Sequence, residues 1–136
     1  MKAMVVYDSL HGNTEKVAEA VAEALRAAGA VETRRVGDVK FGELITLDAL
    51  VVGAPTHACQ PSPNAKAFLK SIPANGLEGV RVAAFDTRLP IQETGPAILK
   101  VAAAVLGYAA KPMARTLKKK GGKLVAEPEG FVVEDA

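Results

Sequence analysis

The most informative segment of the chain lies at residues 2–17 and reads Lys-Ala-Met-Val-Val-Tyr-Asp-Ser-Leu-His-Gly-Asn-Thr-Glu-Lys-Val. Residues 2–8 form a short apolar run, which predicts a strand buried on both faces. Helical spacing begins at residue 13 and continues to residue 28, where the predicted apolar stripe contains Val17, Val21, Ala24, Leu25 and Ala28. A polar turn at residues 9–14 therefore connects a buried strand to an amphipathic helix.

The rest of the chain continues this alternation of strands and helices. Further strands are predicted at residues 31–36 (an edge strand), 48–54, 80–86, 123–126 and 131–133. Further helices are predicted from an N-cap at Ser62 to about residue 72, and at residues 96–106 and 109–120. The pattern predicts an α/β fold with a mostly parallel sheet, in one domain over residues 1–136. Ligands bind such sheets at the carboxyl ends of strands, which here are loops 8–14, 53–62 and 86–95.

The composition excludes several classes of protein. The 136 residues carry 17 basic and 15 acidic side chains, a balance that does not predict a nucleic-acid partner. A single cysteine, Cys59, excludes an internal disulfide framework and a thiolate metal cluster. No run approaches the ~20 apolar residues of a membrane span, and no signal-peptide core is present. We therefore expect a cytoplasmic protein with no membrane association.

The turn at residues 9–14 has the size and chemistry of a phosphate site. The start of a helix presents unpaired N–H groups and a positive partial charge. Gly12 allows the backbone to approach a ligand, and Ser9, Asn13 and Thr14 add short polar side chains. An ordinary capped helix start would use the same residue types, so this alternative stays open. The glycine motifs of dinucleotide and Walker-type sites are absent after every predicted strand.

The segment Ser9-Leu10-His11-Gly12-Asn13-Thr14 resembles the FMN-phosphate loop of the flavodoxin family, whose pattern is Ser/Thr-x-Thr/Ser-Gly-Asn-Thr. His11 stands where the family usually has a hydroxyl. Residues 51–57 and 84–88 resemble the family's second and third flavin-contacting loops, and the similarity keeps a consistent order over residues 1–133. The resemblance implies a doubly wound parallel sheet of five strands in the order 2-1-3-4-5, which binds one FMN non-covalently.

The resemblance also implies a set of binding residues and no catalytic residue or metal ligand, because the cofactor itself performs the chemistry in this class. It assigns the phosphate to Ser9, His11, Gly12, Asn13 and Thr14, one side of the flavin ring to Pro55, Thr56, His57, Ala58 and Cys59, and the other edge to Asp86, Thr87 and Arg88.

The ring loops depart from the family pattern because they contain no aromatic residue. Tyr108 is a possible substitute, although ordinary packing explains it as well. His57 is the preferred hydrogen-bond donor to the ring, and Cys59 is interpreted as a small packing residue rather than a redox thiol. We hypothesise that Arg88 stabilises the anionic reduced flavin by Coulomb attraction; the alternative is an exposed arginine that binds backbone carbonyls.

The end of the chain is a further departure, because the usual C-terminal helix of the family is absent after the last predicted strand. Residues 96–106 are apolar all round, which indicates burial on more than one side. A large exposed apolar patch is uncommon on a soluble monomer, so we expect a homodimer or a higher oligomer.

Three functions are compatible with the sequence. The preferred one is an FMN-binding redox protein that transfers electrons between a reductase and an acceptor, with a redox partner protein or a small electron acceptor as its partner. The second is an FMN-dependent NAD(P)H:quinone-type oxidoreductase. The third is a flavodoxin-like interaction module without a cofactor. Cations at residues 115–123 are interpreted mainly as a solvated helix end, with a docking patch for an acidic partner as the alternative.

Overall fold

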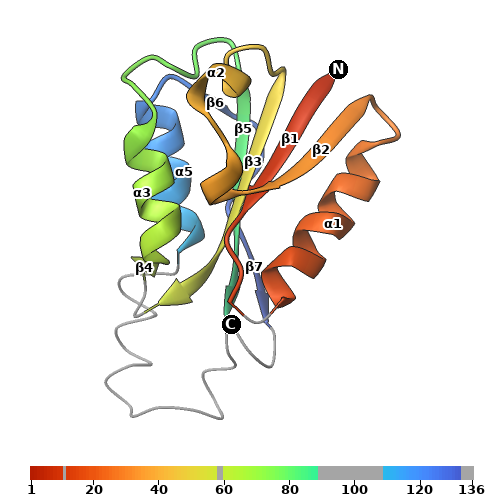
Figure 1. Cartoon of the computed structure of the whole chain (residues 1–136), viewed down its shortest axis with the longest axis vertical. Coiled ribbons are helices and arrows are strands. Elements are labelled where there is room, and N and C mark those ends of the chain that lie inside the picture. The colour runs from red at the N-terminus through yellow and green to blue at the C-terminus, as the bar shows by residue number, and fades with distance from the viewer. Residues whose placement is uncertain (11, 58–59, 89–108, 133–136) are drawn as a thin grey trace.

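The computed structural model describes residues 1–10, 12–57, 60–88 and 109–132, which form a parallel sheet with helices on both faces (Figure 1). The central strands are β1 (Lys2–Tyr7), β3 (Ala49–His57) and β5 (Arg81–Arg88). At one edge, β2 (Ala30–Arg35) lies beside β1. At the other edge, β6 (Lys123–Leu124) and β7 (Glu129–Val132) lie beside β5. The short strand β4 (Gln60–Pro61) pairs antiparallel with the end of β3.

The strand order confirms the expected arrangement. The order β2-β1-β3-β5-β6 is the predicted 2-1-3-4-5 once the short antiparallel β4 is left aside. The fifth position is divided between two strands, because β6 pairs with the first two residues of β5 and β7 pairs with its last four. Pro128 lies between them and has no N–H to donate to β5, which is consistent with this interruption.

The helices cover the two faces of the sheet unequally. Helix α1 (Asn13–Leu25) packs on one face, while α3 (Pro63–Ser71) and α5 (Ala110–Lys119) lie side by side on the other (Figure 1). The connection from β2 to β3 contains the short helices η1 (Val36–Asp38) and α2 (Phe41–Leu44). The helix predicted at residues 96–106 and the loop residues 89–95 lie outside the described residues.

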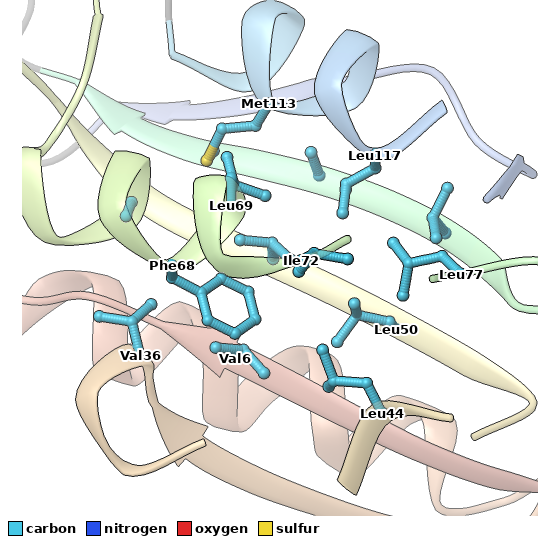
Figure 2. Packing of buried hydrophobic residues seen from close by; sticks show 14 of the residues in the cluster. Val6, Val36, Leu44, Leu50, Phe68, Leu69, Ile72, Leu77, Met113 and Leu117 are labelled. Atoms are coloured by element: carbon cyan, nitrogen blue, oxygen red, sulfur yellow. The ribbon is translucent and has the colours of Figure 1, made fainter. Parts of the chain in front are cut away.

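Alternating side chains of the central strands divide the core into two clusters. The larger cluster is formed by α3 and α5 over β3, and Figure 2 shows Phe68, Leu69 and Met113 packed above Leu50. The smaller cluster joins α1 to the other face through side chains such as Phe85. All residues of β1 from Ala3 to Tyr7 are buried, so the prediction of a strand buried on both faces is confirmed.

Two local predictions were confirmed only in part. Val17, Val21 and Leu25 of the predicted stripe pack against the smaller cluster, whereas Ala24 and Ala28 are exposed. The buried centre of α1 is formed instead by Ala18 and Ala22, whose small side chains allow the helix to lie close to the sheet. Ser62 occupies the N-cap position of α3, but its hydroxyl makes no capping hydrogen bond and instead donates to Asp8 Oδ2 at 2.5 Å.

The close contact between β3 and β5 at Gly53 predicts a large loss of stability from one added methyl group. A Cβ at Gly53 would lie 2.0 Å from Cζ of Phe85, its partner on β5. Gly53→Ala is therefore expected to lower the free energy of unfolding by about 1–3 kcal/mol in a urea titration. Gly37→Ala is the control, because a Cβ there meets nothing within 4 Å, and its effect should stay below about 0.5 kcal/mol. Equal effects of the two substitutions would contradict the prediction.

Candidate functional site

The carboxyl ends of β1, β3 and β5 lie at the same end of the sheet, opposite the N-terminus in Figure 1. The register places Tyr7 beside Gly53 and Gly53 beside Phe85, so the segments that follow these strands are neighbours. This edge brings together the three loops that the sequence predicts to bind a ligand, as far as the structure describes them.

The first loop ends in an open helix start. Gly12 is the N-cap of α1 with a φ of 86°, a backbone conformation that favours glycine, and a Cβ there would meet nothing within 4 Å. The Gly12 N–H donates to Ser9 Oγ at 3.0 Å, and Gly12, as the N-cap, has no side chain of its own with which to cap the helix. The first-turn N–H groups of a helix have no partners within the helix itself. The loop therefore presents backbone donors and the positive end of the α1 dipole.

Arg35 is a cation beside this loop that the sequence analysis missed. It ends β2 directly opposite Tyr7 of β1, and its Nη1 donates to the Ser9 carbonyl oxygen at 3.4 Å. Its Nη2 lies 3.6 Å from Glu15 Oε1, and its guanidinium lies 5.4 Å from the centre of the Tyr7 ring. Only the parallel register of β1 and β2 brings this residue to the loop, and no local motif indicates it.

Tyr7 is the titratable residue at the end of β1. Its hydroxyl donates to Glu15 Oε2 at 3.3 Å. Burial raises the pKa of Tyr7 above its ordinary value of 10.0, the Glu15 carboxylate raises it further, and Arg35 partly opposes the change.

Buried hydrogen bonds join the loops to one another. Thr14 Oγ1 in the first turn of α1 lies 2.8 Å from Thr87 Oγ1 at the end of β5, and both residues are buried. The Ala109 N–H donates to Thr56 Oγ1 at 3.3 Å, which connects the start of α5 to the end of β3. These contacts hold the three strand ends in a single arrangement.

Asp86 forms the most extensive polar contacts at this edge. Its side chain is fully buried and accepts from Arg88 Nε and Nη2, both at 2.8 Å. Its Oδ2 also accepts from the Ala110 N–H at 2.9 Å, at the first residue of α5. The Arg88 guanidinium lies against Gly130 of β7, where a Cβ would be only 1.9 Å from Nη2. The carboxylate thereby connects β5, α5 and β7.

The predicted binding residues have different positions in the structure. Ser9, Gly12, Asn13 and Thr14 lie together at the start of α1. The side chains of Asp86 and Thr87 are buried and bonded to neighbouring protein groups, while Arg88 is partly exposed. Pro55 is buried and Thr56 is half-buried at the end of β3. His11, Ala58, Cys59, Tyr108 and the side chain of His57 lie outside the described residues.

Other kinds of site receive little support from the described residues. A hollow of about 500 Å³ between the end of β1, η1 and α3 is lined by none of the predicted binding residues. Within the described ranges, no three His, Cys, Asp or Glu side chains are placed to hold a metal ion. Among the helices that the structure describes, none has the length and apolar character needed to cross a lipid bilayer.

The hydrogen bond between Thr14 and Thr87 predicts a non-additive pair of substitutions. Thr14→Val or Thr87→Val alone leaves the other hydroxyl buried without this partner, which should lower the free energy of unfolding by about 1–3 kcal/mol. The double variant should lose clearly less than the sum of the two single losses in urea titrations. Thr46→Val, at an exposed position, is the control. Strictly additive losses would show that the two hydroxyls do not interact.

The raised pKa of Tyr7 predicts a loss of stability in alkaline solution. The unfolded chain ionises at a lower pH than the folded one, so the stability that neutral Tyr7 contributes is complete below about pH 10 and is lost as the pH rises through the folded-state pKa. Tyr7→Phe removes the ionisable hydroxyl and with it this pH-dependent contribution to stability. The difference in urea midpoint between the two proteins should be constant near pH 8 and change above about pH 10. A difference independent of pH would refute the assignment.

Comparison with known proteins supports the resemblance. A family model described as "Flavodoxin domain" matches residues 4–125. A flavodoxin of Aquifex aeolicus is 36% identical over 73 residues, covering 52% of this chain and 40% of the relative. An "NAD(P)H dehydrogenase (quinone)" of Cupriavidus metallidurans is 33% identical over 100 residues, covering 58% of this chain and 50% of the relative. The chain thus spans about half the length of these curated relatives.

Solved structures agree on the fold. A flavodoxin from the domain Archaea superposes with a TM-score of 0.75 at 24% identity, covering 98% of this chain and 85% of that one. A flavodoxin of Streptococcus pneumoniae gives 0.78 at 18% identity, covering 100% and 88%. FMN is the cofactor of such proteins, and electron transfer is their general activity. Because the family match extends over most of its length, the chain belongs to the flavodoxin family.

Proposed function

We propose that this protein binds FMN at the carboxyl edge of the sheet and passes electrons between a reductase and an acceptor. The observation that carries the proposal is the start of α1 at Gly12, an N-cap without a side chain, at the edge where the ends of β1, β3 and β5 meet. An open helix N-terminus at that edge of a parallel sheet is suited to a phosphate group.

The donors of the first loop fit a phosphate monoester. Backbone N–H groups and the hydroxyl of Ser9 supply neutral donors, and the Asn13 side chain adds an amide at the helix start. Arg35 supplies positive charge close to the loop, although Glu15 offsets part of it. We therefore expect the phosphate to be held mainly by dipoles and neutral hydrogen bonds.

The ring side of the proposed site depends on the loops after β3 and β5. In this proposal residues 55–59 lie along one side of the flavin, while Asp86, Thr87 and Arg88 lie at its other edge. Nε and Nη2 of Arg88 both donate to the Asp86 carboxylate, so the charge of Arg88 is largely compensated at short range. We expect Arg88 to act first by holding Asp86, with weaker attraction to the cofactor than an unpaired arginine would have.

Bound FMN supplies reversible electron uptake and release, while the chain sets its position and its access to partners. In this role the chain holds the phosphate at α1 and keeps the two ring loops at a constant separation through its buried hydrogen bonds. Self-association and a cytoplasmic location stay predictions.

One observation favours a second function, an FMN-dependent NAD(P)H:quinone-type oxidoreductase. The relative from Cupriavidus metallidurans carries that activity in its name and is 33% identical over 100 residues. Steady-state oxidation of NAD(P)H in the presence of a quinone would support this enzyme, and its absence from FMN-loaded protein would support the carrier. Protein that is colourless and does not quench the fluorescence of added FMN would instead support the interaction module without a cofactor.

The phosphate site is tested by Asn13→Asp. A carboxylate is favoured at a helix start, so the fold should be retained, but it repels the phosphate of FMN. Titration of FMN fluorescence should show at least about tenfold weaker binding, as expected for about 1.4 kcal/mol of repulsion. Riboflavin, which lacks the phosphate, should lose little affinity.

The matched control is Asn64→Asp, which makes the same change in the first turn of α3. Its affinity for FMN should equal that of the unchanged protein. Equal weakening of FMN and riboflavin by Asn13→Asp would show that the loop does not contact the phosphate.

A further inference from the structure

The cationic side chains are concentrated on one helical layer. Helices α3 and α5, together with Lys120 after α5, contain seven of the 17 cationic residues and no Asp or Glu. The remaining chain carries ten cationic and 15 acidic residues, a balance of five negative charges. The net charge is near zero, but positive charge is concentrated on α3 and α5. Such an uneven distribution of charge orients an approaching charged partner.

These helix cations are not used within the described structure. The five ion pairs there are all made by arginines: Arg26, Arg34 (twice), Arg35 and Arg88. In the described ranges no lysine of α3 or α5 lies within 4 Å of a carboxylate oxygen. Among the described residues, a partner could therefore bind these lysines without displacing an ion pair.

Three of the lysines surround a groove between the two helices. The groove has a volume of about 250 Å³, and Lys66 and Lys70 of α3 face it together with Lys120 after α5. Its apolar lining is formed by Leu69, Pro61 and Pro112. Apolar contact in the centre with charge at the rim is the usual anatomy of a protein-binding surface.

The size and the lining residues of the groove favour an acidic protein segment over other anionic ligands. A volume of 250 Å³ is below the about 300–1,000 Å³ of drug-sized pockets, so it suits one or two protein side chains. The lining contains no arginine and no aromatic residue, which nucleic-acid surfaces use for base contacts and stacking. An apolar side chain flanked by carboxylates fits both the lining and the rim.

The groove is continuous with the proposed cofactor edge. Gln60 and Pro61, which line one end of it, form β4 and pair with Thr56 and His57 of β3. The first residue of α5 is bonded to Asp86. A segment held between α3 and α5 would therefore lie next to the loop assigned to one side of the flavin.

We propose that the groove between α3 and α5 is the docking site for an acidic segment of a redox partner protein, with Lys66, Lys70 and Lys120 as its charged contacts. The inference rests on the proposed function, because it names the partner class of the same cofactor edge. Removal of these three charges slows association and reduces its salt dependence.

The test compares two triple variants with the same change in charge. The groove variant is Lys66→Gln/Lys70→Gln/Lys120→Gln, and the control is Lys111→Gln/Lys118→Gln/Lys119→Gln on α5, outside the groove lining. The probe is an acidic plant-type ferredoxin. Its affinity for each protein is measured by titration calorimetry, and electron transfer to the FMN-loaded protein is measured by stopped flow at low and high salt.

At low salt, the groove variant should have an affinity for ferredoxin and a rate of electron transfer that are both at least about tenfold lower than those of the unchanged protein. In the control variant, both quantities should change by less than about threefold. Equal losses in both variants, or none in the groove variant, would overturn the proposal. The proposal would also be overturned if a short DNA duplex bound as tightly as ferredoxin and lost affinity by the same factor in the groove variant. Failure to bind FMN would contradict the proposed function separately, because calorimetry without FMN still decides whether the groove docks an acidic protein.

Discussion

The carboxyl edge of the sheet depends on the buried carboxylate of Asp86. Its position in the interior is tolerable only because Arg88 and the first N–H of α5 surround it with hydrogen bonds. Removal of one partner from such a buried pair typically costs about 3–5 kcal/mol, more than most surface contacts contribute. In the described residues every buried side-chain nitrogen or oxygen has a partner, so this edge is polar without being loosely held.

The buried network suits the edge to the binding role proposed for it. Thr14 and Thr87 join α1 to β5, Thr56 joins β3 to α5, and Asp8 joins β1 to the start of α3. These bonds anchor the described parts of the loops to neighbouring helices and strands. A site built in this way keeps its donors in position before a ligand arrives, which lowers the entropic cost of binding.

The two helical layers perform different tasks on the same sheet. Helix α1 approaches the sheet through alanines and presents its N-terminus at the ligand edge. Helices α3 and α5 bury the larger apolar cluster and turn their lysines to solvent. An amphipathic helix has one face for the core and one for water, so packing and charge can be varied independently. This independence allows a nearly neutral chain to carry a strongly basic surface.

Residue spacing alone was enough to predict the α/β class, a mostly parallel sheet and the polar turn at residues 9–14, because periodicity and turn chemistry are local properties. The order of the strands was predicted only through the resemblance to flavodoxins. Residue spacing missed Ala18 and Ala22 at the buried centre of α1 and the partner of the Ser62 hydroxyl, because both depend on contacts with neighbouring elements. The tertiary structure alone brought Arg35 to Ser9, paired Asp86 with α5, and placed Lys66 and Lys120 on the lining of one groove. Such contacts join residues far apart in the chain, and their energies depend on strand register and helix packing, which residue spacing does not encode.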